Sequence, residues 1–231
     1  MEKDIKFDLG QELFEELSRV YITMEGHPLL AAKKYKKGDS LYQEGHIPKG
    51  IFYLKSGSVK VTHSTSKKTV TIRCALSPDF VGYLSLIKHW DYMTTATAIE
   101  NSEAYFIPKH VFIKAIHSGN KFTNILMDVL CNRITETDEE LLQMLTKDVS
   151  QRLALLLLSL NHCKLHDPNH VDGVINIPKK DLASILNINA ETLSRNLSKL
   201  AKEKTIKLHN KKSIVEIISK QKLLQLSRID D

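Results

Sequence analysis

Long apolar runs and paired cysteines are both missing from this chain of 231 residues. A membrane-spanning helix needs about 18 or more consecutive apolar residues, and the most apolar stretch, LALLLLSL at 153–160, is much shorter. The three cysteines, Cys74, Cys131 and Cys163, are odd in number and far apart, which argues against a disulfide framework. We therefore expect no membrane segment and a reducing, cytoplasmic environment.

Catalytic and cofactor motifs are also missing. The sequence contains no Walker loop, no Ser/His/Asp arrangement and no paired-carboxylate motif, so we do not expect an enzyme. No cysteine cluster near the N-terminus offers ligands for an iron–sulfur centre. The densest histidine group, His162, His166 and His170, spans an expected helix end and a loop, where unliganded histidines are common. No cofactor is predicted, and the alternative is a metal at this group or haem at His89.

Positive charge is concentrated in the last third of the chain. Residues 1–146 hold 18 Lys+Arg and 18 Asp+Glu, whereas residues 147–231 hold 15 Lys+Arg and 9 Asp+Glu, which accounts for the whole net charge of +6. A basic small domain behind a neutral larger one indicates a polyanion as the partner of the small domain.

The N-terminal part reads as a short helix followed by many short strands. Residues 8–24 carry apolar residues at helical spacing. From about Pro28 to Pro108, short alternating runs are separated by turn residues, which predicts an antiparallel barrel or roll. Cys74 alternates in phase with Val70 and Ile72, so we expect a thiol in the core of this roll. With the helices that follow, the fold class is α+β.

A long helix is predicted over residues 121–146. Its apolar residues follow a heptad-like spacing, with polar Thr137 completing the series. A helix with more than one apolar side must pack on its own domain and on something else, and a second copy of the chain is the simplest partner. The alternative is a helix buried within one subunit. The expected homodimer seam consists of Leu126, Leu130, Ile134 and Leu141.

The C-terminal part contains two short helices separated by a tight turn. Pro178 suits the start of the first helix, and Asn187 suits a left-handed turn after it. The second helix, about residues 190–203, has one apolar face and one hydrogen-bonding face, and a basic hairpin follows it. This pattern predicts a winged helix-turn-helix that binds double-stranded DNA; the alternative is a generic helical hairpin with a solvated face. The candidate DNA contacts are Lys179, Lys180, Glu191, Thr192, Ser194, Arg195, Ser198, Lys199 and Lys212.

The order of these parts resembles the CRP/FNR family of bacterial transcription regulators over nearly the whole chain. The segments that carry the resemblance are VSQRLALLLL (149–158) and DLASILNINAETLSRNLSKL (181–200), and the most specific part is ETLSR, from Glu191 to Arg195. The resemblance implies a β-roll effector domain of the cyclic-nucleotide-binding, double-stranded β-helix type (1–120), a dimerisation helix (121–146) and a winged helix-turn-helix domain (147–231). It also implies a homodimer on a palindromic promoter site, with RNA polymerase as a further partner.

In this family the segment equivalent to residues 79–98 is the loop that binds the phosphate of a cyclic nucleotide. The resemblance places Tyr83 where the family has a ribose-binding Glu, and Tyr92 or Met93 where it has a phosphate-binding Arg. A buried phosphate needs a compensating cation, and the loop offers only Lys88 and His89. Cyclic AMP in the usual mode is therefore not expected, and the effector is unknown. The candidate pocket consists of Gly82, Tyr83, Leu84, Ser85, Tyr92, Thr94 and Thr95.

The start of the second helix bears on the DNA sequence that it reads. The CRP-type branch of the family carries an Arg just before the Glu, and here that position is Ala190. This resembles the FNR-type arrangement, which implies a TTGA-like half-site. A rival from another class is a small-molecule-binding module whose basic C-terminal domain docks to a protein. DNA binding should weaken steeply with salt, which separates the two.

Overall fold

The computed structural model describes residues 2–26, 32–118, 120–163, 171–209 and 214–228. The chain divides into two compact units, Met1–Thr137 and Asp138–Asp231. The helix α4 (Asn120–Thr146) begins in the first unit and continues into the second. Among the described helices, none is both long enough and apolar enough to cross a membrane.

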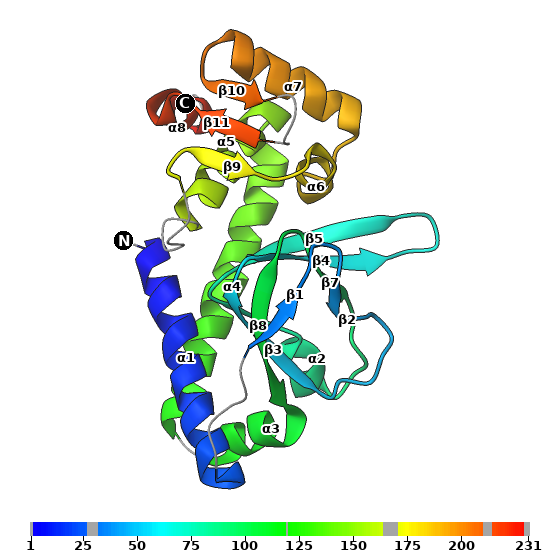
Figure 1. Ribbon diagram of the computed structural model, residues 1–231, viewed down its shortest axis with the longest axis vertical. Coiled ribbons are helices and arrows are strands. Elements are labelled where there is room, and N and C mark those ends of the chain that lie inside the picture. The colour runs from blue at the N-terminus through cyan, green and yellow to red at the C-terminus, as the bar shows by residue number, and fades with distance from the viewer. Residues whose placement is uncertain (1, 27–31, 119, 164–170, 210–213, 229–231) are drawn as a thin grey trace. The chain divides into compact units, whose positions relative to one another are not determined.

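The N-terminal unit contains a roll of two four-stranded antiparallel sheets (Figure 1). Their strand orders are β1-β8-β3-β6 and β2-β7-β4-β5, and side chains from both sheets form one apolar cluster between them. This confirms the predicted roll. The strands are β1 (Lys33–Tyr35), β2 (Ser40–Tyr42), β3 (Gly50–Ser56), β4 (Ser58–Ser64), β5 (Thr69–Leu76), β6 (Asp79–Val81), β7 (Thr95–Ala98) and β8 (Ser102–Pro108).

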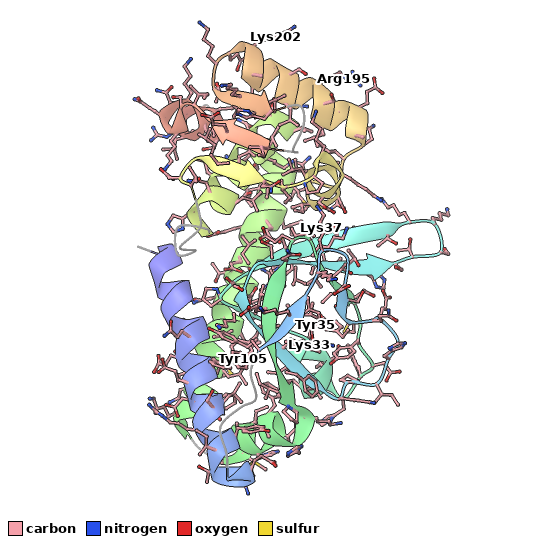
Figure 2. The ribbon with its side chains drawn as sticks, viewed as in Figure 1. Lys33, Tyr35, Lys37, Tyr105, Arg195 and Lys202 are labelled. Atoms are coloured by element: carbon pink, nitrogen blue, oxygen red, sulfur yellow. The ribbon has the colours of Figure 1, made fainter. Side chains whose placement is uncertain are left out.

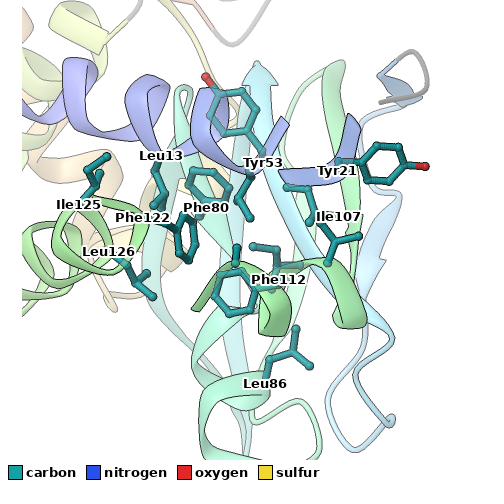
Figure 3. Close-up of a cluster of buried hydrophobic side chains, with 14 residues drawn as sticks. Leu13, Tyr21, Tyr53, Phe80, Leu86, Ile107, Phe112, Phe122, Ile125 and Leu126 are labelled. Carbon is teal, nitrogen blue, oxygen red and sulfur yellow. The ribbon is translucent and has the colours of Figure 1, made fainter. Parts of the chain in front are cut away.

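Three helices cover the outer face of the first sheet: α1 (Glu2–Glu25), α3 (Lys109–Ser118) and the first half of α4. Leu13 and Leu17 of α1 are buried there with Phe112 of α3 and Phe122 of α4 (Figure 3). Burying such side chains is the main favourable term in folding, about 1.5–3 kcal/mol for each. The sheet therefore has a core on each face, which fixes the roll against α4.

The prediction that the Cys74 thiol lies in the core of the roll is wrong. Thr71 and Ala75 of β5 are buried, whereas Ile72 is half-exposed and Cys74 is only partly buried. The strand alternates as predicted, but the opposite face of the strand points inward. The inward face of the strand also carries Arg73. Its buried charge is tolerated there because a carboxylate, that of Asp79, pairs with it.

The C-terminal unit has, in its described part, a three-stranded antiparallel sheet of order β10-β11-β9 and four helices besides the end of α4. The first of these helices begins after Asp148, whose Oδ1 accepts a hydrogen bond of 2.8 Å from the Gln151 N–H. The elements after α4 are α5 (Val149–Cys163), β9 (Val174–Asn176), α6 (Lys179–Ile185), α7 (Ala190–Lys202), β10 (Ile206–His209), β11 (Ile214–Ile217) and α8 (Lys220–Ser227).

Candidate nucleic-acid interface and effector loop

The turn between α6 and α7 has the predicted left-handed residue. Asn187 has φ of 53°, a conformation that Asn tolerates better than most residues. Asn189 then caps α7, because its Oδ1 accepts a hydrogen bond of 2.7 Å from the Thr192 N–H. The turn and the cap together fix where α7 starts and which of its faces is turned inward.

The inward face of α7 is apolar and the outward face is polar. Leu193, Leu197 and Leu200 are buried, as the sequence predicts. Arg195 and Lys202 lie on the opposite side of the helix (Figure 2). This outward face is slightly hollowed over a region lined by Ser194, Arg195, Ser198, Lys199, Lys202 and Glu203.

An ion pair lies on the outward face near the start of α7. Arg195 Nη2 is 3.2 Å from Glu191 Oε1, one turn away, and both side chains are exposed. Lys179 and Lys180 are exposed in the first turn of α6, whereas Thr192 is half-buried and gives its N–H to the helix cap. Of the remaining candidate contacts, Lys212 lies outside the described residues.

A buried polar contact that sequence reasoning missed connects α7 to α5. Ser150 Oγ donates a hydrogen bond of 2.5 Å to Asn196 Oδ1, and Asn196 Nδ2 donates one of 2.9 Å to the Thr192 carbonyl. Ser150 is buried. This contact orients α7 on the helix that follows α4. Asn196 stands between exposed Arg195 and buried Leu197, so periodicity alone did not single it out.

The candidate effector loop begins at Gly82, whose φ of 90° favours glycine. The short helix α2 (Tyr83–Lys88) follows. Ser85 is buried, and its Oγ accepts a hydrogen bond of 3.2 Å from the Met93 N–H. Leu84 is instead exposed to solvent. The predicted pocket residues therefore do not all face one site.

Aromatic rings fill the roll interior next to Gly82. Tyr92 is buried, stacks on Tyr42 with 4.1 Å between ring centroids, and donates a hydrogen bond of 2.6 Å to the Gly50 carbonyl. Burial raises the pKa of Tyr92 to about 12. A Cβ at Gly82 would lie 3.1 Å from the Tyr92 ring. Two other residues of the predicted pocket make hydrogen-bond contacts within the roll. Thr94 Oγ1 is 3.3 Å from the Tyr42 hydroxyl, and Thr95 Oγ1 accepts a hydrogen bond of 3.0 Å from the Glu44 N–H.

The loop lacks an arginine, but Arg73 of β5 reaches its start, and sequence reasoning missed this. Its guanidinium forms an ion pair with Asp79 and donates a hydrogen bond of 2.9 Å to the Phe80 carbonyl. The side chains of Arg73 and Asp79 are only 10% and 13% exposed. Burial acts to lower the pKa of Arg73, but the Asp79 carboxylate outweighs it, and the net shift is upward. The charge inside the roll is therefore already neutralised within the chain.

The residues of the expected dimer seam differ in exposure along α4. Leu126 is 5% exposed and belongs to the core beside the roll, and Leu130 packs against that core. These two residues are largely occupied within their own chain. Ile134 is 63% exposed, and Leu141 is exposed as well. The exposed residues that share a heptad spacing with Ile134 are Met127, Cys131, Leu141 and Leu145, together with the charged Asp138.

Two sequence profiles match the two parts of the chain. The profile of the cyclic nucleotide-binding domain matches residues 32–118, which hold the roll and α3. The profile of the Crp-like helix-turn-helix domain matches residues 151–226, which hold α6, α7 and the wing strands β10 and β11.

Curated relatives match most of the chain at low identity. The Global nitrogen regulator of Synechococcus elongatus is 22% identical over 192 residues, covering 80% of this chain and 86% of the relative. The Cyclic AMP receptor protein of Thermus thermophilus is 25% identical over 178 residues, covering 75% and 78%. The Fumarate and nitrate reduction regulatory protein of Vibrio cholerae is 22% identical over 227 residues, covering 97% and 86%.

Solved structures share the fold. A transcriptional regulator of the CRP family from Thermus thermophilus, TTHB099, is similar with a TM-score of 0.72 at 17% identity, covering 84% of this chain and 96% of that one. FixK2 from Bradyrhizobium japonicum is similar with a TM-score of 0.71 at 18% identity, covering 87% and 100%. The roll, the long helix and the helix-turn-helix thus occur together in the order that these regulators have, and the chain belongs to the CRP/FNR family of transcription regulators.

Proposed function

We propose that the protein is a cytoplasmic, homodimeric regulator that binds palindromic promoter sites, recruits or contacts RNA polymerase there and carries out no catalysis. The observation that carries this proposal is the outward face of α7. It presents a carboxylate, a guanidinium, hydroxyls and lysines on a helix whose other face is fixed in the core of its unit. A helix of this kind fits the major groove of DNA.

The outward face of α7 suits base recognition near the start of the helix and phosphate binding further along it. A guanidinium held by a carboxylate one turn away is presented for bidentate bonding to guanine O6 and N7, and Glu191 can accept from a cytosine amino group. Ser194 and Ser198 add short hydrogen-bonding groups, and Lys199 and Lys202 suit phosphates. Because Ala190 cannot donate a hydrogen bond, we propose a TTGA-like half-site.

The exposed stripe on α4 supports a two-fold dimer. Met127, Ile134, Leu141 and Leu145 leave apolar surface on one side of a helix of 27 residues. Burying that surface against a second copy would give a parallel coiled coil. A symmetric protein dimer requires a symmetric pair of DNA half-sites.

The filled roll argues against cyclic AMP as an effector in the usual mode and leaves either a different effector or none. By the family resemblance, Tyr83 and either Tyr92 or Met93 stand where a nucleotide would need charged partners, and Tyr92 is packed on Tyr42 inside the roll. The arginine that reaches the loop, Arg73, is bound to Asp79. An anionic phosphate would have to displace that carboxylate, which is costly in a buried site.

Binding selection on randomised duplex tests the proposed function. The full-length protein should enrich sites with two-fold symmetry, and its affinity should fall steeply as salt rises, because each neutralised phosphate releases counterions. Binding without preference for any symmetric duplex would support the rival, in which the basic domain docks to a protein.

A further inference from the structure

A small cavity lies in the N-terminal unit between α1, the start of β6 and α4. Its volume is about 30 Å³. A water molecule needs roughly 10–15 Å³ measured in this way, so the cavity has room for about two waters. Ligand pockets are typically about 300–1,000 Å³, so this cavity is far too small for a nucleotide. Its lining is mixed, and the polar and charged side chains in it need another explanation; they are Asp79, Tyr83, Asn132, Arg133 and Glu136.

Two ion pairs face this cavity from opposite elements. On the roll side, Asp79 is bound by Arg73. On the helix side, Arg133 Nη1 is 2.8 Å from Glu136 Oε2 within α4, with the side chains 21% and 28% exposed. Each arginine thus has its own carboxylate, and the four charges sum to zero. A ligand that bound here would have to compete with partners that are always present.

Tyr83, the first residue of α2, lines the same cavity as Asp79 of the roll-side pair and as Arg133 and Glu136 of the helix-side pair. Its side chain is partly buried. Burial raises the pKa of its hydroxyl. One cavity thus brings the phenol together with charged residues from the roll and from α4.

The helix that carries Arg133 and Glu136 leads out of the N-terminal unit. The first unit ends at Thr137, one residue after Glu136, and α4 continues to Thr146 in the second unit. Whatever fixes residues 129–136 on the roll therefore fixes the part of α4 that leads toward the DNA-binding unit. Buried apolar contacts fix the start of α4, through Phe122 and Leu126. Val129 and Leu130 also pack against that core, and beyond them Asn132, Arg133 and Glu136 line the cavity that faces the roll.

We infer that the Tyr83 cluster, consisting of Arg73, Asp79, Tyr83, Arg133 and Glu136, takes the place of a small-molecule effector. It holds α4 on the roll from within, so that DNA binding by this protein requires no bound ligand. The packing of Tyr92 on Tyr42 inside the roll agrees with this, because the interior is filled by the chain's own side chains. The inference rests on the proposed DNA-binding function.

The test compares two variants that remove the same charge from the same helix. Glu136→Gln removes the partner of Arg133, whereas Glu139→Gln removes an exposed carboxylate three residues away. Full-length protein is unfolded in guanidinium, dialysed and refolded, and mass spectrometry verifies that no small molecule remains. DNA affinity is then measured by fluorescence anisotropy with a selected palindromic duplex, and hydrogen exchange is followed over residues 125–137.

The stripped wild-type protein should bind the duplex as tightly as protein that was never unfolded. Glu136→Gln should weaken DNA binding about tenfold, which is within the usual range of coupling between sites, and should speed hydrogen exchange in residues 125–137. Glu139→Gln should change the DNA affinity and the exchange rate by less than about twofold. Loss of binding on stripping, restored by a lysate extract of small molecules, would overturn the inference. Equal behaviour of the two variants would overturn it as well. If no duplex is bound under any condition while the exchange difference persists, the proposed function fails and the structural role of the cluster stands.

Discussion

Glu191 and Arg195 form an ion pair one turn apart on the exposed face of α7, with 3.2 Å between the carboxylate oxygen and the guanidinium nitrogen. An exposed pair of this kind contributes at most about 1 kcal/mol to stability. Its consequence is geometric, because it restricts a long side chain that is otherwise free to rotate. Arg195 is thereby prepared to bind one base, and most of the specificity of the protein should depend on it.

Arg195→Ala should therefore reduce preference for guanine at one position of each half-site. The expected cost is about 1–3 kcal/mol for the specific duplex and close to nothing for a duplex that lacks the guanine. Lys199→Ala is the matched control, because Lys199 lies on the same face and suits phosphates. It should weaken binding to all sequences alike and lower the salt slope by roughly one. Anisotropy titrations on single-base variants of the site measure both. An intact guanine preference in Arg195→Ala would mean that another residue reads the base.

Ile134→Asp should convert the dimer to monomers. It would place two unpaired charges in the expected seam, at a cost of several kcal/mol. Sedimentation velocity measures the outcome. Leu126→Ala is the control, because Leu126 is buried in its own chain; it should lower the free energy of unfolding by about 2–5 kcal/mol and leave the dimer intact. A dimer that survives Ile134→Asp and dissociates in Leu126→Ala would place the interface elsewhere.

Cys131 allows a second, independent test of the same dimer seam. It is exposed on α4 at heptad spacing from Ile134, so its counterpart in a parallel two-fold dimer should lie close to it. Mild oxidation with diamide should give a crosslinked dimer on a non-reducing gel, and Cys131→Ser should abolish it. Crosslinking that persists in Cys131→Ser would assign the bridge to another cysteine and place the Cys131 side of α4 outside the interface.

Cyclic AMP should not bind tightly. The family resemblance places uncharged residues, Tyr83 and either Tyr92 or Met93, at the positions that would need charged groups. Arg73 is already bound to Asp79. Isothermal titration calorimetry with cyclic AMP should show no micromolar site, and duplex affinity should be the same with and without the nucleotide. A saturable micromolar isotherm would show that the roll can open and that its tyrosines are displaced.

The raised pKa of Tyr92 predicts that the free energy of unfolding falls at alkaline pH. Its pKa is raised to about 12 from 10.0 by burial, so the unfolded chain releases this proton before the folded protein does. The stabilisation is fully present below pH 10 and is lost as the pH rises toward about 12. Tyr92→Phe also leaves the Gly50 carbonyl without its hydroxyl donor and should cost about 1–3 kcal/mol near neutral pH. Urea unfolding at several pH values should show that this deficit shrinks above pH 10; a constant deficit would contradict the assigned cause.

The sequence predicts most of the fold because its signals are local. The left-handed turn at Asn187 and the apolar face of α7 each depend on residues a few positions apart, and the structure confirms both. The roll was predicted from alternation and turn residues, and both sheets are present.

The errors arose where two distant segments meet. Leu126 and Ile134 follow one spacing in the sequence, but only the packing of α1 and α3 decides that Leu126 is covered. Cys74 was expected inward with Val70 and Ile72, whereas Arg73 lies inward, because its partner Asp79 on another strand offsets the cost of burying the charge. The contact between Ser150 and Asn196 likewise joins two helices that are far apart in the sequence.

Selection of duplexes from a fully randomised library by the purified, ligand-stripped dimer, followed by sequencing, tests the central claim most directly. The account predicts enrichment of a two-fold symmetric site with TTGA-like half-sites, and loss of the guanine from the enriched motif when the selection is repeated with Arg195→Ala. Enrichment of no symmetric motif by the wild-type protein, or an unchanged motif with Arg195→Ala, would contradict it.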